Sequence, residues 1–225
     1  MNKEIQEKLR KMSHANPVDE AVMTILKSQS QCCVRARVRL EEMKKTVGKN
    51  VLFISGSPRK GNTEHVISRL YESVVGNKEI LLLRSKNVKR CIGCLACHHQ
   101  PVCTIKDDDV PEIMESVLAA DVLVIGTPNY FENVSGLTKD FIDRLHPFYK
   151  PKTIQGKKLI IFMVGGGKSH GSLEMLKSSM QGFVKHYGLE LVGAFAFQGL
   201  NPKDVECDPQ NEQTVSDMVE MINGL

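Results

Sequence analysis

The stretch Val51-Leu-Phe-Ile-Ser55-Gly-Ser-Pro-Arg-Lys-Gly-Asn-Thr63 decides the fold of this chain. Its first five residues form a short, mainly apolar run, which is typical of a strand buried on both faces. The glycines and the proline that follow predict a tight turn, and Thr63 opens a stretch with helical spacing. The whole stretch therefore predicts a strand, a turn and a helix, which is the first unit of an α/β domain.

The same alternation continues along the rest of the chain. Short apolar runs that alternate with helical patterns predict an open, doubly wound, five-stranded parallel sheet with right-handed crossovers. Ligands of such sheets bind beyond the carboxyl ends of the strands, so the loops after the first, third and fourth strands are the expected binding loops. The predicted strands are 51–55, 80–83, 122–126, 159–164 and 191–197, and the predicted helices are 63–75, 108–120, 135–146, 172–187 and 210–223.

The turn after the first strand, residues 56–63, has the contents of a phosphate site. It lacks the Gly-Lys-Ser/Thr ending of a Walker loop and the three-glycine dinucleotide fingerprint, so it is no nucleotide P-loop. Short polar side chains, an arginine fork and the unpaired N–H groups of a helix start still suit a monophosphate. The alternative is a polar β–α turn in which Thr63 only caps its helix. The candidate side chains are Ser57, Arg59, Asn62 and Thr63.

A second motif follows the third strand: Gly126-Thr-Pro-Asn-Tyr-Phe-Glu-Asn-Val-Ser-Gly-Leu-Thr-Lys-Asp-Phe-Ile-Asp-Arg144. Together with the first loop, Gly-Ser-Pro-Arg-x-Gly-Asn-Thr, it resembles the NADPH-dependent FMN reductase group of the flavodoxin-like superfamily over about residues 50–200. The resemblance implies that the first loop binds the FMN phosphate. It also implies that the second motif lines the isoalloxazine ring through Pro128, Asn129, Tyr130 and Phe131.

The resemblance implies a third flavin contact, a glycine-bearing loop after the fourth strand. Here this loop reads Gly165-Gly-Gly-Lys-Ser-His-Gly171, and its spacing departs from the family pattern. Glycines let the backbone come close to a flat ring, which makes Gly166 and Gly167 candidates. Lys168 and His170 either bring positive charge to a reduced flavin or are ordinary surface residues.

Four cysteines lie close together in the stretch Cys91-Ile-Gly-Cys94-Leu-Ala-Cys97-His-His-Gln-Pro-Val-Cys103. The spacing lets the first three thiolates converge on one cubane, and Cys103 can return as the fourth ligand. It resembles the compact motif of the iron-sulfur flavoproteins, a branch of the same superfamily that combines FMN with a [4Fe-4S] cluster. Zinc more often takes two separated Cys-x2-Cys pairs. Structural zinc and reduced cysteines without metal are the alternatives.

Charged residues and histidines flank the cysteines. Lys86, Lys89 and Arg90 would offset the negative charge of a thiolate-ligated cluster. The acidic run 107–109 is expected to cap the next helix. His98 and His99 are interpreted as exposed loop residues, because four sulfurs already satisfy a cluster.

The composition is that of a globular protein expected in the cytoplasm. The chain has 225 residues, 41% of them apolar, which is enough for one large domain with an appendage. No apolar run approaches the ~20 residues of a membrane span, and the charged start lacks the apolar region of a signal peptide. Residues 50–225 are predicted to form the flavodoxin-like FMN domain, with the cysteine-rich loop at 91–103.

Residues 1–49 are predicted to form a helical N-terminal extension. They hold 11 Lys and Arg against 6 Asp and Glu, whereas residues 50–225 hold 19 against 20. A solvated helical face is the simplest interpretation of this charge, and docking of an acidic partner, a membrane surface or nucleic acid is the alternative. The extension contains no Phe, Tyr or Trp, which argues against stacking on single-stranded nucleic acid.

The candidate flavin loops, the cysteine loop and the family resemblance together predict an FMN-dependent oxidoreductase. In it, a donor such as ferredoxin reduces a [4Fe-4S] cluster that passes electrons to FMN. Two alternatives stay open: an NAD(P)H-dependent FMN or quinone reductase without a cluster, and a redox-sensing or partner-binding module. No catalytic acid or base is predicted, because the protein's part is positioning and electrostatic tuning. The family resemblance implies a homo-oligomer, either a dimer or a tetramer.

Overall fold

The computed structural model describes residues 48–166 and 169–225, so nearly all of the predicted N-terminal extension lies outside the described residues. Five parallel strands form one sheet in the order β2-β1-β3-β4-β5, which is the flavodoxin-like order. The predicted doubly wound five-stranded sheet is therefore confirmed. The strands are β1 (Asn50–Ser55), β2 (Asn77–Leu82), β3 (Val122–Pro128), β4 (Lys158–Gly165) and β5 (Glu190–Gln198).

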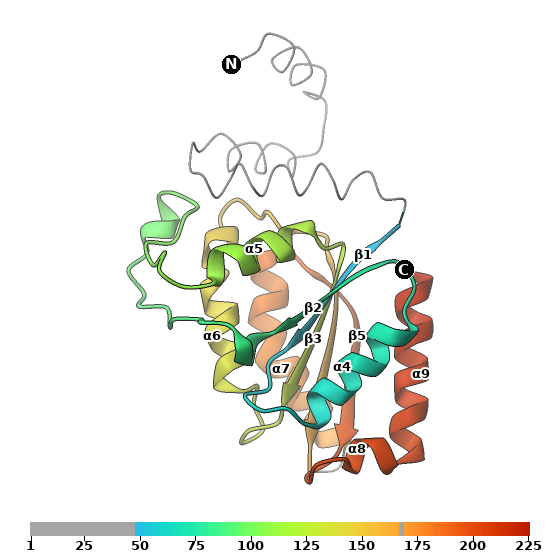
Figure 1. Cartoon of the computed structure of the whole chain (residues 1–225). Helices are drawn as coiled ribbons and strands as arrows, with labels where there is room; N and C mark the ends of the chain where they lie inside the picture. Colours follow the sequence, from blue (N-terminus) through green and yellow to red (C-terminus); the bar gives the residue numbers. More distant parts are fainter. Residues whose placement is uncertain (1–47, 167–168) are drawn as a thin grey trace.

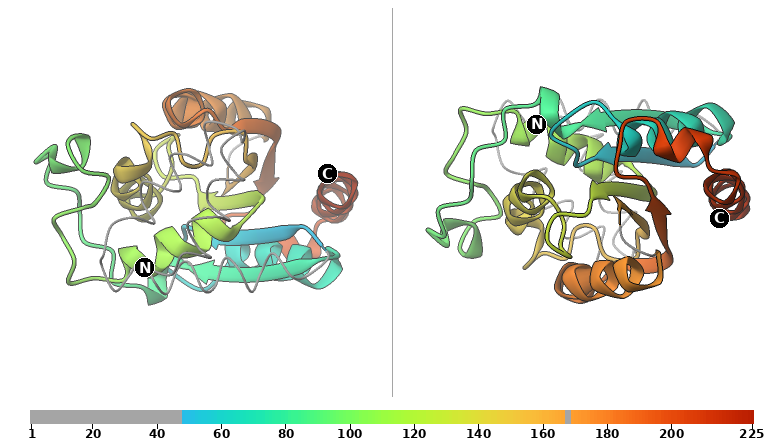
Figure 2. Two further views of the ribbon diagram at one scale, coloured as in Figure 1. Left: turned by 90° about the horizontal axis from the view of Figure 1, so that it is seen from above. Right: turned by 90° about the horizontal axis from the view of Figure 1, so that it is seen from below.

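Helices cover both faces of the sheet, as Figures 1 and 2 show. One face packs against α5, α6 and α7, and the other against α4, α8 and α9. All five predicted long helices are present in the structure. Their bounds are α4 (Asn62–Ser73), α5 (Val110–Ala119), α6 (Gly136–Arg144), α7 (Ser169–Tyr187) and α9 (Pro209–Gly224), with short helical turns at Leu83–Ser85, Ala96–His98, His146–Phe148 and α8 (Asp204–Cys207).

The alternation of side chains along β1 divides the core into two clusters. Leu52 and Ile54 point into the cluster under α5, α6 and α7, while Val51 and Phe53 point into the cluster under α4 and α9. All four are at most 2% exposed, so burial of both faces accounts for the continuous apolar run in the sequence. No helix in residues 48–166 and 169–225 is long and apolar enough to cross a membrane.

The two edge strands differ from the sequence prediction. β2 pairs with β1 from Asn77 onward, so it begins three residues before the predicted run, and Leu83 belongs to the helical turn that follows. β5 is only partly buried along most of its length. An edge strand has a neighbour on one side only, so polar residues such as Lys78 and Glu79 are tolerated in it, and these residues conceal its start.

Replacing Gly126 by alanine should destabilise the fold, because a Cβ at this position would lie 2.1 Å from the ring of buried Phe162. We expect a loss of about 1–3 kcal/mol in the free energy of unfolding, measured by urea denaturation. Gly136→Ala is the control: an added Cβ there has no neighbour within 4 Å, so its effect should stay within about 0.5 kcal/mol. Equal losses in the two variants would contradict the packing explanation.

Candidate functional site

The loops after β1 and β3 are joined by buried hydrogen bonds at the carboxyl edge of the sheet. The N–H of Gly56 donates to the carbonyl of Gly126 over 2.8 Å, and the Ser135 hydroxyl donates to the Gly56 carbonyl over 2.6 Å. A Cβ on Gly56 would lie 1.8 Å from Thr138 Oγ1, so only glycine fits at this position. The start of the candidate phosphate loop is thus packed directly against α6.

Ser135 is the centre of this junction. It is the N-cap residue of α6, and its Oγ accepts a hydrogen bond from the N–H of Thr138. Its own N–H donates to Thr127 Oγ1 over 3.0 Å, and Thr138 Oγ1 donates to the same oxygen over 3.1 Å. All three side chains are buried, so β3, the β1 loop and α6 are held together independently of any ligand.

Residues 57–63 form a compact loop that ends in the first turn of α4. The buried Ser57 hydroxyl donates to the Arg59 carbonyl over 2.7 Å and accepts the Arg59 N–H over 3.3 Å, while the Arg59 side chain is exposed. Gly61 occupies the N-cap position, where no side chain caps the helix, and Thr63 is buried in the first turn. The helix start is therefore open to an acceptor from outside the chain, which fits a phosphate group.

Asn62 has a structural role in addition to its predicted one. Its amide nitrogen donates to the Asn201 carbonyl over 2.8 Å, and its amide oxygen accepts the N–H of Lys203 over 3.0 Å. The side chain therefore connects α4 to the loop after β5. Sequence reasoning predicted three binding loops and did not predict this contact with the loop after β5, although the turn residues Gly199, Asn201 and Pro202 signal a loop there.

The predicted aromatic turn protrudes from the end of β3. Tyr130 and Asn133 exchange two backbone hydrogen bonds of 3.0 and 3.2 Å, and the two residues between them have positive φ angles, 52° at Phe131 and 61° at Glu132. Tyr130 is 45% exposed and Phe131 is fully exposed. Two uncovered aromatic rings held on a strained turn suit the edge of a flat ligand such as an isoalloxazine ring.

The loop after β4 meets the same turn. The N–H of Asn129 donates to the Val164 carbonyl over 2.7 Å, and a Cβ on Gly165 would lie 2.7 Å from Cβ of Asn129. Pro128 and Asn129 are partly buried at this contact, and Gly166 is exposed beside it. The predicted loops after β1, β3 and β4 thus lie at one edge of the sheet. Gly167 and Lys168 lie outside the described residues, and so does the side chain of His170.

The four cysteines of the loop share one pocket of about 330 Å³. The loop projects from the side of the domain beyond α5 and α6, as Figures 1 and 2 show. The pocket also contains Arg144 and His146, so it lies at the end of α6 opposite to Ser135. The residues that line it include Cys91, Ile92, Cys94, Leu95, Cys97, Cys103, Thr104, Asp143, Arg144 and His146.

The thiols in this pocket differ in acidity. Hydrogen bonds from the Thr104 hydroxyl and from the backbone near Ala96 lower the pKa of Cys94. Burial raises the pKa of Cys97, and the charges of the three neighbouring cysteines raise it further. The other three sulfurs therefore lie within electrostatic range of Cys97. Even so, within residues 48–166 and 169–225 no three His, Cys, Asp or Glu side chains form a group that could hold a single metal ion.

The flanking charges behave differently from the expectation. Lys86, Lys89 and Arg90 each pair with a carboxylate, those of Glu112, Asp107 and Asp140 respectively. Their charge is thus largely offset within the chain. The acidic run contacts the start of α5 as expected, but through Asp108, whose carboxylate accepts the N–H of Val110 over 3.2 Å. Asp109 occupies the N-cap position, and its carboxylate accepts the N–H of Asn87.

The two loop histidines differ in burial. His99 is exposed as expected, but His98 is partly buried and stacks on His146, with Nε2 atoms 2.6 Å apart and ring planes 6° apart. Burial lowers the pKa of His146, and the neighbouring His98 lowers it further. One ring must donate and the other accept, so the contact needs at least one neutral imidazole.

Sequence reasoning missed several residues that shape both sites. Thr127, Ser135 and Thr138 build the junction at the carboxyl edge of the sheet, and Arg144 with Asp108 lies at the base of the cysteine loop. The serine and threonines resemble ordinary cap and strand residues in the sequence. Arg144 was part of the quoted second motif, but no local pattern shows that an arginine at the end of α6 is buried.

Comparison with known proteins gives consistent results. The family model described as NADPH-dependent FMN reductase matches residues 49–198. An iron-sulfur flavoprotein of Archaeoglobus fulgidus is 42% identical over 97 residues, which are 42% of this chain and 47% of that protein. An iron-sulfur flavoprotein of Methanosarcina thermophila is 31% identical over 169 residues, which are 73% of this chain and 88% of that protein.

A solved structure shares the fold. The NAD(P)H:quinone oxidoreductase from Methanothermobacter marburgensis superimposes with a TM-score of 0.62 at 17% identity, covering 79% of this chain and 96% of that one. The fold, the edge loops and the matches together define a flavodoxin-like, FMN-dependent oxidoreductase. The chain belongs to the iron-sulfur flavoprotein and NADPH-dependent FMN reductase family.

Ser135→Ala should destabilise the protein, because it removes the cap of α6 and leaves the buried Gly56 carbonyl without its 2.6 Å donor. We expect a loss of about 1–3 kcal/mol in the free energy of unfolding, measured by urea denaturation. Ser73→Ala, at the exposed end of α4, is the matched control and should change stability little. A Ser135 variant as stable as the control would show that the hydrogen bonds of Ser135 do not stabilise the fold.

Proposed function

We propose that this FMN-dependent oxidoreductase is an electron-transfer protein whose cysteine pocket holds a [4Fe-4S] cluster. The observation that carries the proposal is the presence of four cysteines around one pocket of about 330 Å³. When bound, the cluster supplies one-electron transfer and FMN supplies one- or two-electron transfer. The ligands proposed for the cluster are Cys91, Cys94, Cys97 and Cys103.

The donor set fits a cubane better than a single ion. Each thiolate of a [4Fe-4S] cluster binds a different iron, so the four sulfurs are spread more widely than around one zinc ion. The arrangement in this protein agrees with the wider spacing. Four cysteines line one pocket, and no group of side chains among the described residues could hold a single ion. A buried donor supports the same assignment: Nε of Arg144, in the lining of the pocket, has no hydrogen-bond partner within the described part of the chain.

The loops at the sheet edge fit FMN. We propose that Ser57, Arg59 and Thr63, with the open start of α4, bind the phosphate, and that Asn62 holds the loop after β5 against this site. The flat ring would then lie beside the turn after β3 and the glycines after β4, where backbone comes close without side chains in the way. The ring-side residues proposed are Pro128, Asn129, Tyr130, Phe131, Gly166 and Gly167.

The two proposed sites lie at opposite ends of α6. Ser135 caps this nine-residue helix beside the flavin edge, and Arg144 ends it in the cysteine pocket. The helix alone spans about 13 Å. Two apolar side chains at the pocket are uncovered, Ile92 at 72% exposure and Leu95 at 54%. The separation of the two sites within one chain and the exposed apolar side chains beside the pocket support a homo-oligomer, a dimer or tetramer. In it, the cluster of one subunit would lie near the FMN of another.

The electron donor that fits this protein depends on whether a cluster is bound. A ferredoxin-like protein suits a cluster that accepts single electrons, whereas NAD(P)H would deliver a hydride to FMN directly. The second candidate function, an NAD(P)H-dependent FMN or quinone reductase without a cluster, is supported by the family description. In both cases residues 50–225 would form the working domain, with residues 1–49 as an extension.

Protein prepared without oxygen is expected to contain about four iron and four acid-labile sulfide per chain. Cys94→Ser should lose most of the iron and keep FMN, because its pocket lies at the Arg144 end of α6, opposite to the proposed flavin edge. Cys207→Ser is the matched control, since this exposed cysteine lies in α8, and it should keep both. Stoichiometric zinc, or no metal after anaerobic reconstitution, would favour the cluster-free reductase.

Thr63→Ala should weaken binding of FMN more than binding of riboflavin, which lacks the phosphate. Loss of one hydrogen bond to a charged group corresponds to roughly tenfold to a hundredfold in affinity. Flavin fluorescence titration of the metal-free protein measures both dissociation constants. An equal loss for the two flavins would indicate a disturbed fold, and no loss for either would remove Thr63 from the phosphate site.

A further inference from the structure

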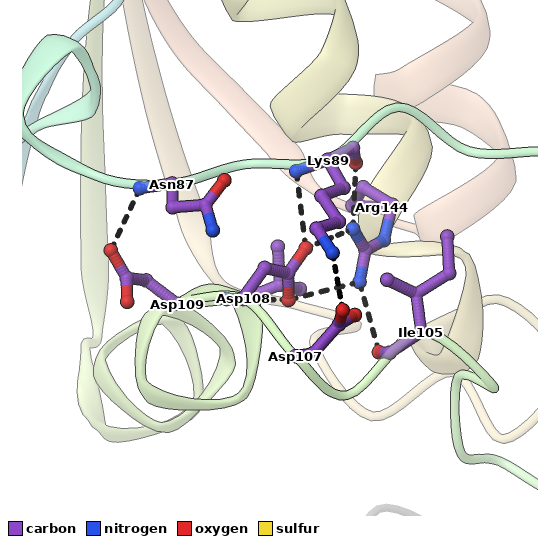
Figure 3. A network of polar contacts seen from close by, with 8 residues as sticks. Asn87, Lys89, Ile105, Asp107, Asp108, Asp109 and Arg144 are labelled. Atoms are coloured by element: carbon purple, nitrogen blue, oxygen red, sulfur yellow. Dashed lines mark hydrogen bonds and ion pairs between the residues drawn. The ribbon is translucent and has the colours of Figure 1, made fainter.

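One buried arginine closes the base of the cysteine loop. Arg144 ends α6 and forms an ion pair with Asp108, and their side chains are 1% and 0% exposed. Figure 3 shows the guanidinium between the two chain segments that enter and leave the loop. The surface pairs around it are far more exposed, so this pair is distinct from the screened charges on the rim.

Arg144 contacts both segments at once. Its Nη1 donates to the carbonyl of Lys89 over 2.6 Å, two residues before Cys91. Its Nη2 donates to the carbonyl of Ile105 over 3.2 Å, two residues after Cys103. A planar fork that reaches two backbone carbonyls and a carboxylate uses geometry that lysine lacks.

Asp108 completes the closure from the other side. Its carboxylate accepts the N–H of Lys89 over 3.1 Å and the N–H of Val110 over 3.2 Å. Next to it, Asn87 and Asp109 exchange two hydrogen bonds, of 2.7 and 2.9 Å. The entry and exit of the loop are thereby held side by side at the start of α5, as Figure 3 shows.

The same arginine belongs to the cysteine pocket. Burial alone would lower the pKa of Arg144, but the hydrogen bond to Asp108 and the interaction with Cys103 outweigh it and raise the pKa. An arginine side chain stays protonated in proteins, so a positive charge lies in the pocket that Cys103 also lines. Cys91, Cys94 and Cys97 are brought together by their local spacing, whereas five residues separate Cys97 from Cys103, which needs another constraint.

We propose that Arg144 and Asp108 are positioning residues for the cysteine pocket. They close residues 90–104 into a loop in the metal-free chain and so bring Cys103 to the other three cysteines. The positive charge of Arg144 then favours the more negative, reduced state of the cluster, and Asp108 opposes this effect. The tuning step rests on the proposed cluster, whereas the closure is a property of the metal-free chain.

The closure is tested on metal-free protein by hydrogen exchange. The amides of His98, His99 and Asp109 donate within the loop or across its base. In Arg144→Lys and Arg144→Gln these amides should exchange at least about tenfold faster. The loop of these variants opens at a lower free-energy cost, because the hydrogen bonds of the guanidinium are already absent. Arg90→Gln is the matched control: it removes an exposed arginine next to Cys91 and should leave exchange unchanged. FMN binding and the melting temperature verify that each variant is folded.

The tuning is tested on the reconstituted protein by iron content and reduction potential. Arg144→Gln should hold less iron than wild type and shift the cluster potential to more negative values, whereas Asp108→Asn, which keeps its shape, should shift it to more positive values. Shifts of the same sign would overturn the charge role, and unchanged exchange in both Arg144 variants would overturn the closure. If the wild type takes up no iron, the proposed cluster is wrong, and the exchange result still decides the closure.

Discussion

Buried polar contacts at both ends of α6 fix the relative position of the proposed flavin edge and the cysteine pocket. At its start, Ser135 donates to the Gly56 carbonyl and receives the helix N–H of Thr138. At its end, the Arg144 guanidinium bonds the two segments that flank the cysteine loop. Because the helix between them is one rigid element packed on the sheet, the two sites cannot move independently without breaking buried hydrogen bonds.

The two sites are built by different means. The proposed flavin edge follows from the sheet itself, because the carboxyl ends of parallel strands and the loops after them lie on one side. Close packing then refines it: glycines at 56, 126 and 165 stand where a Cβ would lie within 2.7 Å of a neighbouring atom. The cysteine pocket has no sheet beneath it. It is formed by a loop that projects from the sheet and its covering helices, and the shape of this loop depends on a few polar side chains at its base.

Charge around the cysteine pocket is arranged in pairs. The rim cations each meet a carboxylate, and exposed pairs of this kind contribute little energy. The buried pair of Arg144 and Asp108 is different, because solvent does not screen it and removing one partner would leave a buried charge. A cluster in this pocket would therefore respond more to these two residues than to the larger number of lysines and arginines nearby. The overall charge of the loop is a poor guide to its chemistry.

The sequence alone determined the fold class, five strands, the long helices and the family, because apolar periodicity and glycine-rich turns are local properties. It also identified the cysteine loop and the three loops that do meet at the edge of the sheet. Only the tertiary structure decided what depends on contacts between distant residues. The side-chain amide of Asn62 bonds the loop after β5 through both its nitrogen and its oxygen, His98 stacks on His146, and Arg144 is buried against Asp108. Such contacts join residues up to 141 positions apart, as Asn62 and Lys203 are, and no local pattern records which distant partner will satisfy a polar side chain.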